Sequence, residues 1–148
     1  MDPFQLALRY LERRARTEQE LREKLARRQV PPQAIEAVLA KLKDYGYIND
    51  TTFAINWQRY RNDFKPMGVR RIKLELYQKG VAKEIIATVS AEKEAELTLA
   101  RQAAETRLRQ YAHLDRPTFE RRLSAFLARR GFDYRTVKQI VDELKPAK

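Results

Sequence analysis

The chain of 148 residues contains no cysteine and a single histidine, His113. The lack of cysteine excludes a disulfide scaffold, a thiolate nucleophile and a cysteine-based zinc site. One histidine also excludes a metal site built on several imidazoles. The sequence has no nucleophile elbow and no glycine-rich loop that could cradle a phosphate. We therefore expect no cofactor, no bound metal and no enzymatic activity.

Long apolar runs are absent too. No stretch approaches the roughly 20 apolar residues that a membrane-spanning helix needs. The first residues, "MDPFQLALRYLERRARTEQ", lack a basic leader followed by an apolar segment, so they predict a helix and not a signal peptide. The absence of cysteine fits a reducing compartment. We expect a soluble, cytoplasmic protein that makes no contact with a membrane.

Glycine is scarce, with four residues at positions 46, 68, 80 and 131. Together with six prolines they divide the chain into short segments, in which apolar residues recur at helical spacing. No segment alternates as a strand would, and no Asn-Gly hairpin signal occurs. Thr17 and Glu20 form a capping-box pattern. The sequence predicts an all-α protein of about nine helices, at 3–15, 18–29, 32–45, 51–63, 68–79, 82–90, 92–111, 117–129 and 134–145.

One apolar pattern occurs three times along the chain. Gly80 and Gly131 hold the same place in two copies, just past a helix end, where a left-handed backbone favours glycine. Gln29 stands there in the first copy, ahead of Val-Pro-Pro. The aligned apolar positions are Leu21, Ile72 and Leu123; Leu25, Leu76 and Leu127; Val30, Val81 and Phe132; Ile35, Ile86 and Val137; and Val38, Val89 and Ile140.

The repeat predicts three tandem three-helix units, at 1–48, 49–91 and 92–148. A unit of this size buries little surface alone and needs its neighbours for stability. We therefore expect the units to stack into an elongated, curved array.

Acidic residues are few relative to basic ones, 20 against 31, which gives a net charge of +11 and a pI near 10.1. Such a surplus favours a polyanionic partner. Basic residues recur where the second helix of each unit ends, as Arg27-Arg28, Gln78-Lys79 and Arg129-Arg130. Cations there suit the helix dipole. A second interpretation is a discontinuous basic stripe, richest in the middle unit.

Two central motifs resemble the RecX family, the bacterial regulators of the RecA recombinase. They are "YGYINDTTFAINWQRYR" (45–61) and "MGVRRIKLELYQKGV" (67–81), flanked by the RecX-like "RTEQELREKL" (16–25) and "FLARRGFDYRTVKQIVDEL" (126–144). The resemblance covers about residues 5–145 and itself implies three tandem three-helix repeats. It implies a non-enzymatic protein that binds the RecA–DNA filament, lies in its helical groove and inhibits recombinase, ATPase and coprotease activities. This role would belong to homologous recombination, DNA repair and the SOS response.

Few functional residues transfer from that resemblance, because the family has no sharply defined catalytic motif. Gly68, Arg71, Glu75, Leu76, Lys79 and Gly80 match its central motif. The resemblance implies contacts with RecA and allows direct contacts with single- or double-stranded DNA. From charge and spacing we expect basic residues to make these contacts, and we expect a monomer. The expected binding residues are Arg59, Arg70, Arg71, Lys73 and Lys79, supported by Arg27, Arg28, Arg129 and Arg130.

Two other functions compete with this interpretation. The first is a helix-turn-helix DNA-binding regulator that acts without RecA and uses 68–79 as its recognition helix. The second is an enzyme with Asp44, Asp50 and Glu75 as a carboxylate cluster, although each has a simpler role at a helix end, in a cap or in an ion pair. The aromatic residues could stack on bases, but helical spacing favours a core position for Tyr45, Tyr47, Phe53, Trp57 and Tyr60.

Overall fold

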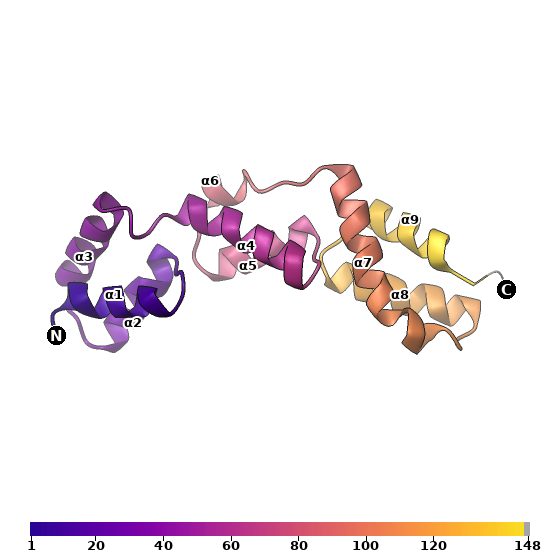
Figure 1. The fold of residues 1–148 in the computed structure, drawn as a ribbon, viewed down its shortest axis with the longest axis horizontal. Coiled ribbons are helices and arrows are strands. Elements are labelled where there is room, and N and C mark those ends of the chain that lie inside the picture. Colours follow the sequence, from indigo (N-terminus) through magenta and orange to yellow (C-terminus); the bar gives the residue numbers. More distant parts are fainter. Residues whose placement is uncertain (147–148) are drawn as a thin grey trace. The chain divides into compact units, whose positions relative to one another are not determined.

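The structure is a computed structural model that describes residues 1–146. Within them the chain forms nine helices and no strand (Figure 1), which confirms the all-α prediction. The helices are α1 (Pro3–Arg13), α2 (Glu18–Arg27), α3 (Pro32–Asp44), α4 (Asp50–Phe64), α5 (Val69–Gln78), α6 (Lys83–Ile86), α7 (Lys93–Tyr111), α8 (Arg116–Arg129) and α9 (Tyr134–Leu144).

The sixth helix is the one whose predicted length is wrong. The sequence pattern predicts a helix over 82–90, but α6 contains only four residues, Lys83–Ile86. Thr88 explains part of the difference, because its backbone N–H and its hydroxyl both donate to the carbonyl of Ile85, at 3.0 and 2.6 Å. These contacts close a turn where a longer helix would continue.

The chain packs into two compact units. The first contains residues 1–56 and 75–88, and the second contains 57–74 and the described residues from 89 on. The boundaries fall inside α4 and α5, so residues of the predicted middle domain occur in both units. The division into domains 1–48, 49–91 and 92–148 stays a prediction.

In the first unit, α1, α2 and α3 pack against one another (Figure 1). Thr17 ties this bundle to residues 75–88, because its fully buried hydroxyl donates to the carbonyl of Lys79 at 2.6 Å. Gly80 touches the side chain of Gln19, where a Cβ would collide. The buried core consists of Ala7, Leu21, Leu25, Ile35, Val38, Leu39, Leu42 and Ile48.

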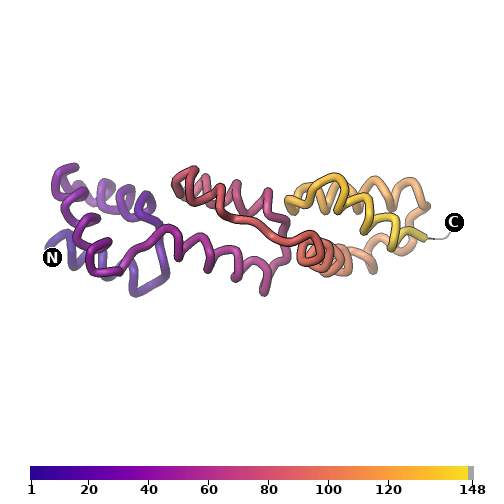
Figure 2. Tube along the Cα trace, turned by 90° about the horizontal axis from the view of Figure 1, so that it is seen from above, coloured from indigo at the N-terminus to yellow at the C-terminus, as the bar shows by residue number. Residues whose placement is uncertain are grey.

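In the second unit, α7, α8 and α9 pack side by side (Figures 1 and 2). Alanines on α7 allow α8 and α9 to approach closely, and Phe119, Phe126 and Phe132 fill the remaining space. The buried core consists of Leu97, Leu99, Ala100, Ala103, Ala104, Phe119, Leu123, Phe126, Leu127, Phe132, Val137, Ile140 and Val141.

The repeated apolar positions are core positions. Leu21, Ile72 and Leu123 are fully buried, and so are Leu25, Leu76 and Leu127. Two of the other aligned residues, Val30 and Ile86, are only partly buried. The repeat therefore marks most clearly the buried face of the second helix in each of its three copies, which are α2, α5 and α8.

The same turn follows that second helix in all three copies. Gly80 and Gly131 have φ of 81° and 92°, and Gln29 has φ of 62°, so Gln29 adopts the left-handed backbone without being glycine. In each copy this residue donates to the carbonyl three positions back, and the next residue donates to the carbonyl five positions back. This is the Schellman motif.

Side chains cap α2 and α4, and the cap of α2 is the predicted one. Thr17 and Glu20 form the predicted capping box at the start of α2. Asn49 caps α4 by accepting from the N–H of Thr52 at 3.1 Å. The Asp50 carboxylate instead accepts a hydrogen bond from the backbone N–H of Glu18 at 3.0 Å. It therefore gives a partner to one of the N–H groups in the first turn of α2 that have none within the helix.

Candidate functional site

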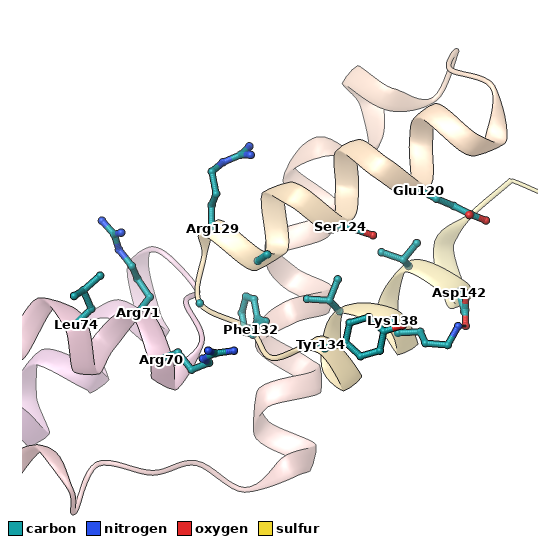
Figure 3. A pocket seen from close by; sticks show the side chains of 14 residues that line it. Arg70, Arg71, Leu74, Glu120, Ser124, Arg129, Phe132, Tyr134, Lys138 and Asp142 are labelled. Carbon is teal, nitrogen blue, oxygen red and sulfur yellow. Dashed lines mark ion pairs between the residues drawn. The ribbon is translucent and has the colours of Figure 1, made fainter.

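A groove of about 640 Å³ lies on the second unit, lined by α8, α9 and the first residues of α5 (Figure 3). We call it the α8–α9 groove. Its apolar lining is provided by Leu74, Ala128, Phe132, Val137 and Val141. Its polar lining is provided by Arg70, Arg71, Glu120, Ser124, Arg129, Tyr134, Lys138 and Asp142.

Two glycines bring α5 against the turn between α8 and α9. The N–H of Gly68 donates to the carbonyl of Arg130 at 2.8 Å, and a Cβ on Gly68 would collide with the backbone of Gly131. A Cβ on Gly131 would likewise collide with the backbone of Arg71. This backbone contact brings Arg70 and Arg71 of α5 into the lining of the groove, to which Arg129 contributes from the end of α8 (Figure 3).

The groove has cations at one end and neutralised charge at the other. Neither Arg70 nor Arg129 forms an ion pair with a carboxylate in residues 1–146. Asp142 is instead paired with Lys138 at 3.7 Å and with Lys145 at 3.4 Å. The end formed by α5 and the α8–α9 turn therefore carries the net positive charge.

Arg70 also acts on Asp133, the N-cap of α9. The N–H of Thr136 donates to the Asp133 carboxylate at 2.8 Å and holds its pKa below the ordinary value. Arg70 contributes to the lower pKa through its charge. The carboxylate is thus ionised at neutral pH and caps the helix.

The structure brings together three of the nine predicted binding residues, Arg70, Arg71 and Arg129, in the α8–α9 groove. The others lie outside its lining. Arg28 and Arg59 are exposed on the surface, and Lys73 is partly buried. Arg27 forms an ion pair with Glu23, one helical turn earlier, with 3.9 Å between Nη2 and Oε2.

Lys79 and Arg130 have packing contacts of their own. Lys79 forms an ion pair with Glu20 at 3.4 Å, and its ammonium lies 5.9 Å from the centre of the Phe53 ring. Arg130 donates to the carbonyl of Pro66 at 3.0 Å. Both side chains therefore contribute to the fold.

The sequence interpretation missed a second cluster of cations. The guanidinium carbons of Arg107 and Arg130 lie 4.6 and 4.8 Å from the centre of one ring, that of Phe126. The guanidinium carbon of Arg61 on α4 lies 4.8 Å from the centre of the Trp57 ring. Burial lowers the pKa of Arg130, and repulsion from Arg107 and from Arg61 lowers it further. No local pattern links α4, α7 and the end of α8, so only the tertiary fold reveals this cluster.

The expectation of core positions for the aromatic residues is right for Phe53 and wrong for three others. Phe53 is buried, whereas Tyr45, Tyr47 and Tyr60 are more than half exposed. Phe64, which the interpretation left out, is 74% exposed.

Among the described residues, no metal site forms around the candidate carboxylates Asp44, Asp50 and Glu75. Within residues 1–146 no group of acidic and histidine side chains could hold a metal ion. Burial raises the pKa of Asp50, although the N–H that it accepts from Glu18 opposes the shift. Asp44 is an exposed residue at the end of α3. In the same part of the chain, no helix has the length and apolar character to cross a membrane.

Comparison with known proteins gives matches along almost the whole chain. Three family models match in order: the first three-helix domain of RecX at residues 4–42, the second at 49–89 and the third at 94–141. The regulatory protein RecX of Amycolatopsis mediterranei is 34% identical over 88% of this chain and 75% of its own length. The regulatory protein RecX of Streptomyces coelicolor is 35% identical over 93% and 77%.

A solved structure agrees with the fold. The crystal structure of RecX from Lactobacillus salivarius superposes with a TM-score of 0.84 at 26% identity, covering 96% of this chain and 94% of that one. Architecture and comparisons together define an all-helical protein built from three successive three-helix domains. The chain belongs to the RecX family.

Proposed function

We propose that this protein is a non-enzymatic regulator of RecA that binds the RecA–DNA filament and inhibits its recombinase, ATPase and coprotease activities. Its partners are RecA and the DNA of the filament, and it acts as a cytoplasmic monomer lying in the helical groove of the filament. Membership of the RecX family supports the regulatory role. The α8–α9 groove supports the way in which the protein would bind.

The observation that carries this proposal is the combination of an apolar lining with arginines at one end. Leu74, Phe132 and Val141 offer apolar surface, while Arg70 and Arg129 form no ion pair with any residue between 1 and 146. Such a groove suits a protein segment in which an apolar side chain is flanked by carboxylates. Binding along a polymer also adds avidity, because several weak contacts form on neighbouring protomers.

The test is DNA-dependent ATP hydrolysis by RecA with increasing amounts of the full chain. We expect the wild type to inhibit hydrolysis and the charge-reversed variant R70E/R71E to have lost inhibition, with an unchanged far-UV circular dichroism spectrum. A second variant, R70E/R129E, changes two residues that form no ion pair in the described part of the chain, and it should show the same loss. Undiminished inhibition by both variants would reject the groove as the binding surface.

The matched control reverses two neighbouring arginines outside the groove. Arg121 and Arg122 lie exposed on α8, and neither lines the groove. R121E/R122E changes the net charge by the same amount as R70E/R71E. It should retain inhibition if the effect depends on the position of the arginines in the groove and not on net charge alone. Equal loss in the control and the test variant would indicate a purely electrostatic effect.

The competing function, a helix-turn-helix regulator, predicts sequence-specific DNA binding without RecA. A competition experiment between duplexes of different sequence separates the two. Absence of any effect on RecA, together with preference for one duplex, would favour the competing function.

A further inference from the structure

One contact occurs twice in the molecule, once within each compact unit. In the first unit, the hydroxyl of Thr17 donates to the carbonyl of Lys79 at 2.6 Å. In the second unit, the N–H of Gly68 donates to the carbonyl of Arg130 at 2.8 Å. Each residue of the second pair lies 51 positions after its counterpart in the first, so the repeat itself carries the contact. We call it the turn–helix contact, because the turn after α5 meets the start of α2, and the turn after α8 meets the start of α5.

Both turns need glycine at the point of contact. A Cβ on Gly80 would collide with the Cβ of Gln19, and a Cβ on Gly131 would collide with the backbone of Arg71. The left-handed backbone of the turn does not by itself require glycine, because Gln29 adopts φ of 62° after α2. It is therefore the close approach that excludes a larger residue from the two turns that form the contact.

The turn after α2 is the remaining copy of this turn, and it has Gln29 in place of glycine. Its backbone is built in the same way. The N–H of Gln29 donates to the carbonyl of Ala26 at 2.9 Å, and the N–H of the next residue donates to the carbonyl of Leu25 at 3.1 Å. The Gln29 side chain is exposed. If this turn docked on a helix start as the other two do, the Cβ of Gln29 would fall where only glycine fits.

The start of α8 is the third copy of the receiving helix start, and an additional turn of helix covers it. The three second helices end at equivalent positions of the repeat, but α8 has 14 residues where α2 and α5 have 10 each. The extra residues are 116–119, and Phe119 is the counterpart of Gly68. The N–H of Phe119 donates to the carbonyl of Asp115 at 2.9 Å, and its side chain is buried in the core. Phe119 therefore cannot offer its N–H to an arriving turn, as Gly68 does.

We infer that this protein is closed against docking by a second copy of itself, by Gln29 in the turn after α2 and by the additional first turn of α8. Without these two features, the turn after α2 of one molecule would meet the start of α8 in another. Such a contact joins two different surfaces, so it would continue from molecule to molecule into an open chain. Repeat proteins need modified end repeats for this reason. The inference gives a structural reason for the proposed monomer, and its test requires no RecA.

The test is a disulfide that forms only between two docked copies. Across the turn–helix contact of the first unit, the ammonium of Lys79 lies 3.4 Å from the carboxylate of Glu20. The counterparts of these residues in the missing contact are Arg28 and Arg122, and both are exposed. The chain has no cysteine of its own. A disulfide between R28C in one molecule and R122C in another therefore reports the contact directly.

Two sets of substitutions open the two surfaces. Q29G restores glycine in the turn after α2, and T118M/F119G gives the start of α8 the Met-Gly pair that precedes α5. The opened pair is Q29G/R28C mixed with T118M/F119G/R122C, and the closed pair is R28C mixed with R122C. We expect the opened pair to link at least about tenfold faster, because docking raises the effective concentration of the two thiols. Non-reducing gel electrophoresis measures the rate, and each variant oxidised alone gives the rate of chance collisions.

Q29A/R28C is the matched control, because alanine keeps the Cβ that blocks the turn. Mixed with T118M/F119G/R122C, it should link no faster than the closed pair. Equal rates for Q29G and Q29A, or for the opened and the closed pair, would overturn the inference.

A second comparison avoids T118M/F119G, which removes a core ring. G131Q puts glutamine into a formed contact, whereas G46Q puts it at a φ of 76° with nothing within 4 Å of its Cβ. We expect G131Q to melt at a clearly lower temperature than G46Q. Equal melting temperatures would show that glutamine fits the contact, and the inference would then be wrong.

Inhibition of RecA ATP hydrolysis by the wild type is measured alongside. Inhibition together with equal linking rates of the two pairs refutes the closed surfaces alone. Faster linking of the opened pair, without any inhibition of RecA by the wild type, supports the inference and refutes the proposed function.

Discussion

Gly68 and Gly131 meet backbone to backbone at the edge of the α8–α9 groove. A Cβ on Gly68 would collide with the carbonyl group of Gly131 and with the amide nitrogen of Phe132. The N–H of Gly68 also donates to the carbonyl of Arg130 at 2.8 Å. This contact joins the first turn of α5 to the turn after α8, and the position of Arg70 and Arg71 in the groove depends on it.

Substitution G68A should therefore separate these two turns. We expect it to lower the free energy of unfolding by about 1–3 kcal/mol, the usual range for an overpacked contact, and to weaken RecA inhibition because the arginines move. Thermal unfolding and RecA ATP hydrolysis are the measurements. G46A is the control: Gly46 has φ of 76° but nothing within 4 Å of an added Cβ, so only backbone strain of about 1–2 kcal/mol is expected, with inhibition retained.

Gln29 provides a second prediction, because it adopts φ of 62° where the other two copies have glycine. Its side chain is exposed. Q29G should relieve the left-handed strain and raise the free energy of unfolding by up to about 1 kcal/mol, since the loss of backbone entropy offsets part of the gain. Chemical denaturation compares Q29G with Q29A, which keeps a Cβ and should bring no such gain. Equal stability of the two variants would contradict the strain argument.

Much of the fold is predictable from the sequence because its signals are local. Thr17 and Glu20 lie close in sequence, and Gly80 and Gly131 directly follow the helices they end. Apolar spacing likewise identifies Leu76 as a core residue. The length of α6 was not predictable, because the Thr88 turn opposes the apolar pattern.

The groove and the arginine cluster were beyond local reasoning. Arg70 and Arg129 are distant in sequence, and tertiary contacts such as that between Gly68 and Gly131 place them in one groove. The sequence shows that both residues are basic. It does not show which of the many basic residues lie together in the folded chain. Arg107 gave no signal at all, because its role depends on sharing the Phe126 ring with Arg130.

Thr17 should be among the most sensitive polar positions. It is fully buried, accepts from the N–H of Glu20 at 3.1 Å and donates to the carbonyl of Lys79 at 2.6 Å. T17A removes a helix cap, worth about 0.5–2 kcal/mol, and leaves a partly buried carbonyl without its donor, at about 1–3 kcal/mol. We expect a loss of at least about 2 kcal/mol in the free energy of unfolding. T17S keeps the hydroxyl and should recover most of it; a loss as large as that of T17A would exclude the hydrogen bonds as the cause.

Glu96 should make the stability of the protein depend on pH. Burial raises the pKa of this carboxyl, the N–H of Val69 at 3.4 Å opposes the shift, and Asp133 adds to it. Its Oε1 accepts no hydrogen bond from any of the residues 1–146. Because the pKa is higher in the folded than in the unfolded state, the free energy of unfolding falls as pH rises through that interval. E96Q removes this charge and keeps an acceptor for Val69, so it should melt at a higher temperature than the wild type at pH 7.

The advantage of E96Q should shrink as the pH is lowered, and it should vanish where Glu96 is protonated in both states. Melting curves between pH 3 and pH 8, recorded by circular dichroism, measure it. Glu143 provides a control of opposite sign, since its hydrogen bond from Arg101 at 3.0 Å lowers its pKa. That ion pair contributes stability above the unfolded pKa and loses it as pH falls through the folded pKa, so E143Q should melt lower than the wild type at pH 7 and converge with it in acid. A melting difference for E96Q that stays constant across the range would show that packing, and not the charge of Glu96, is responsible.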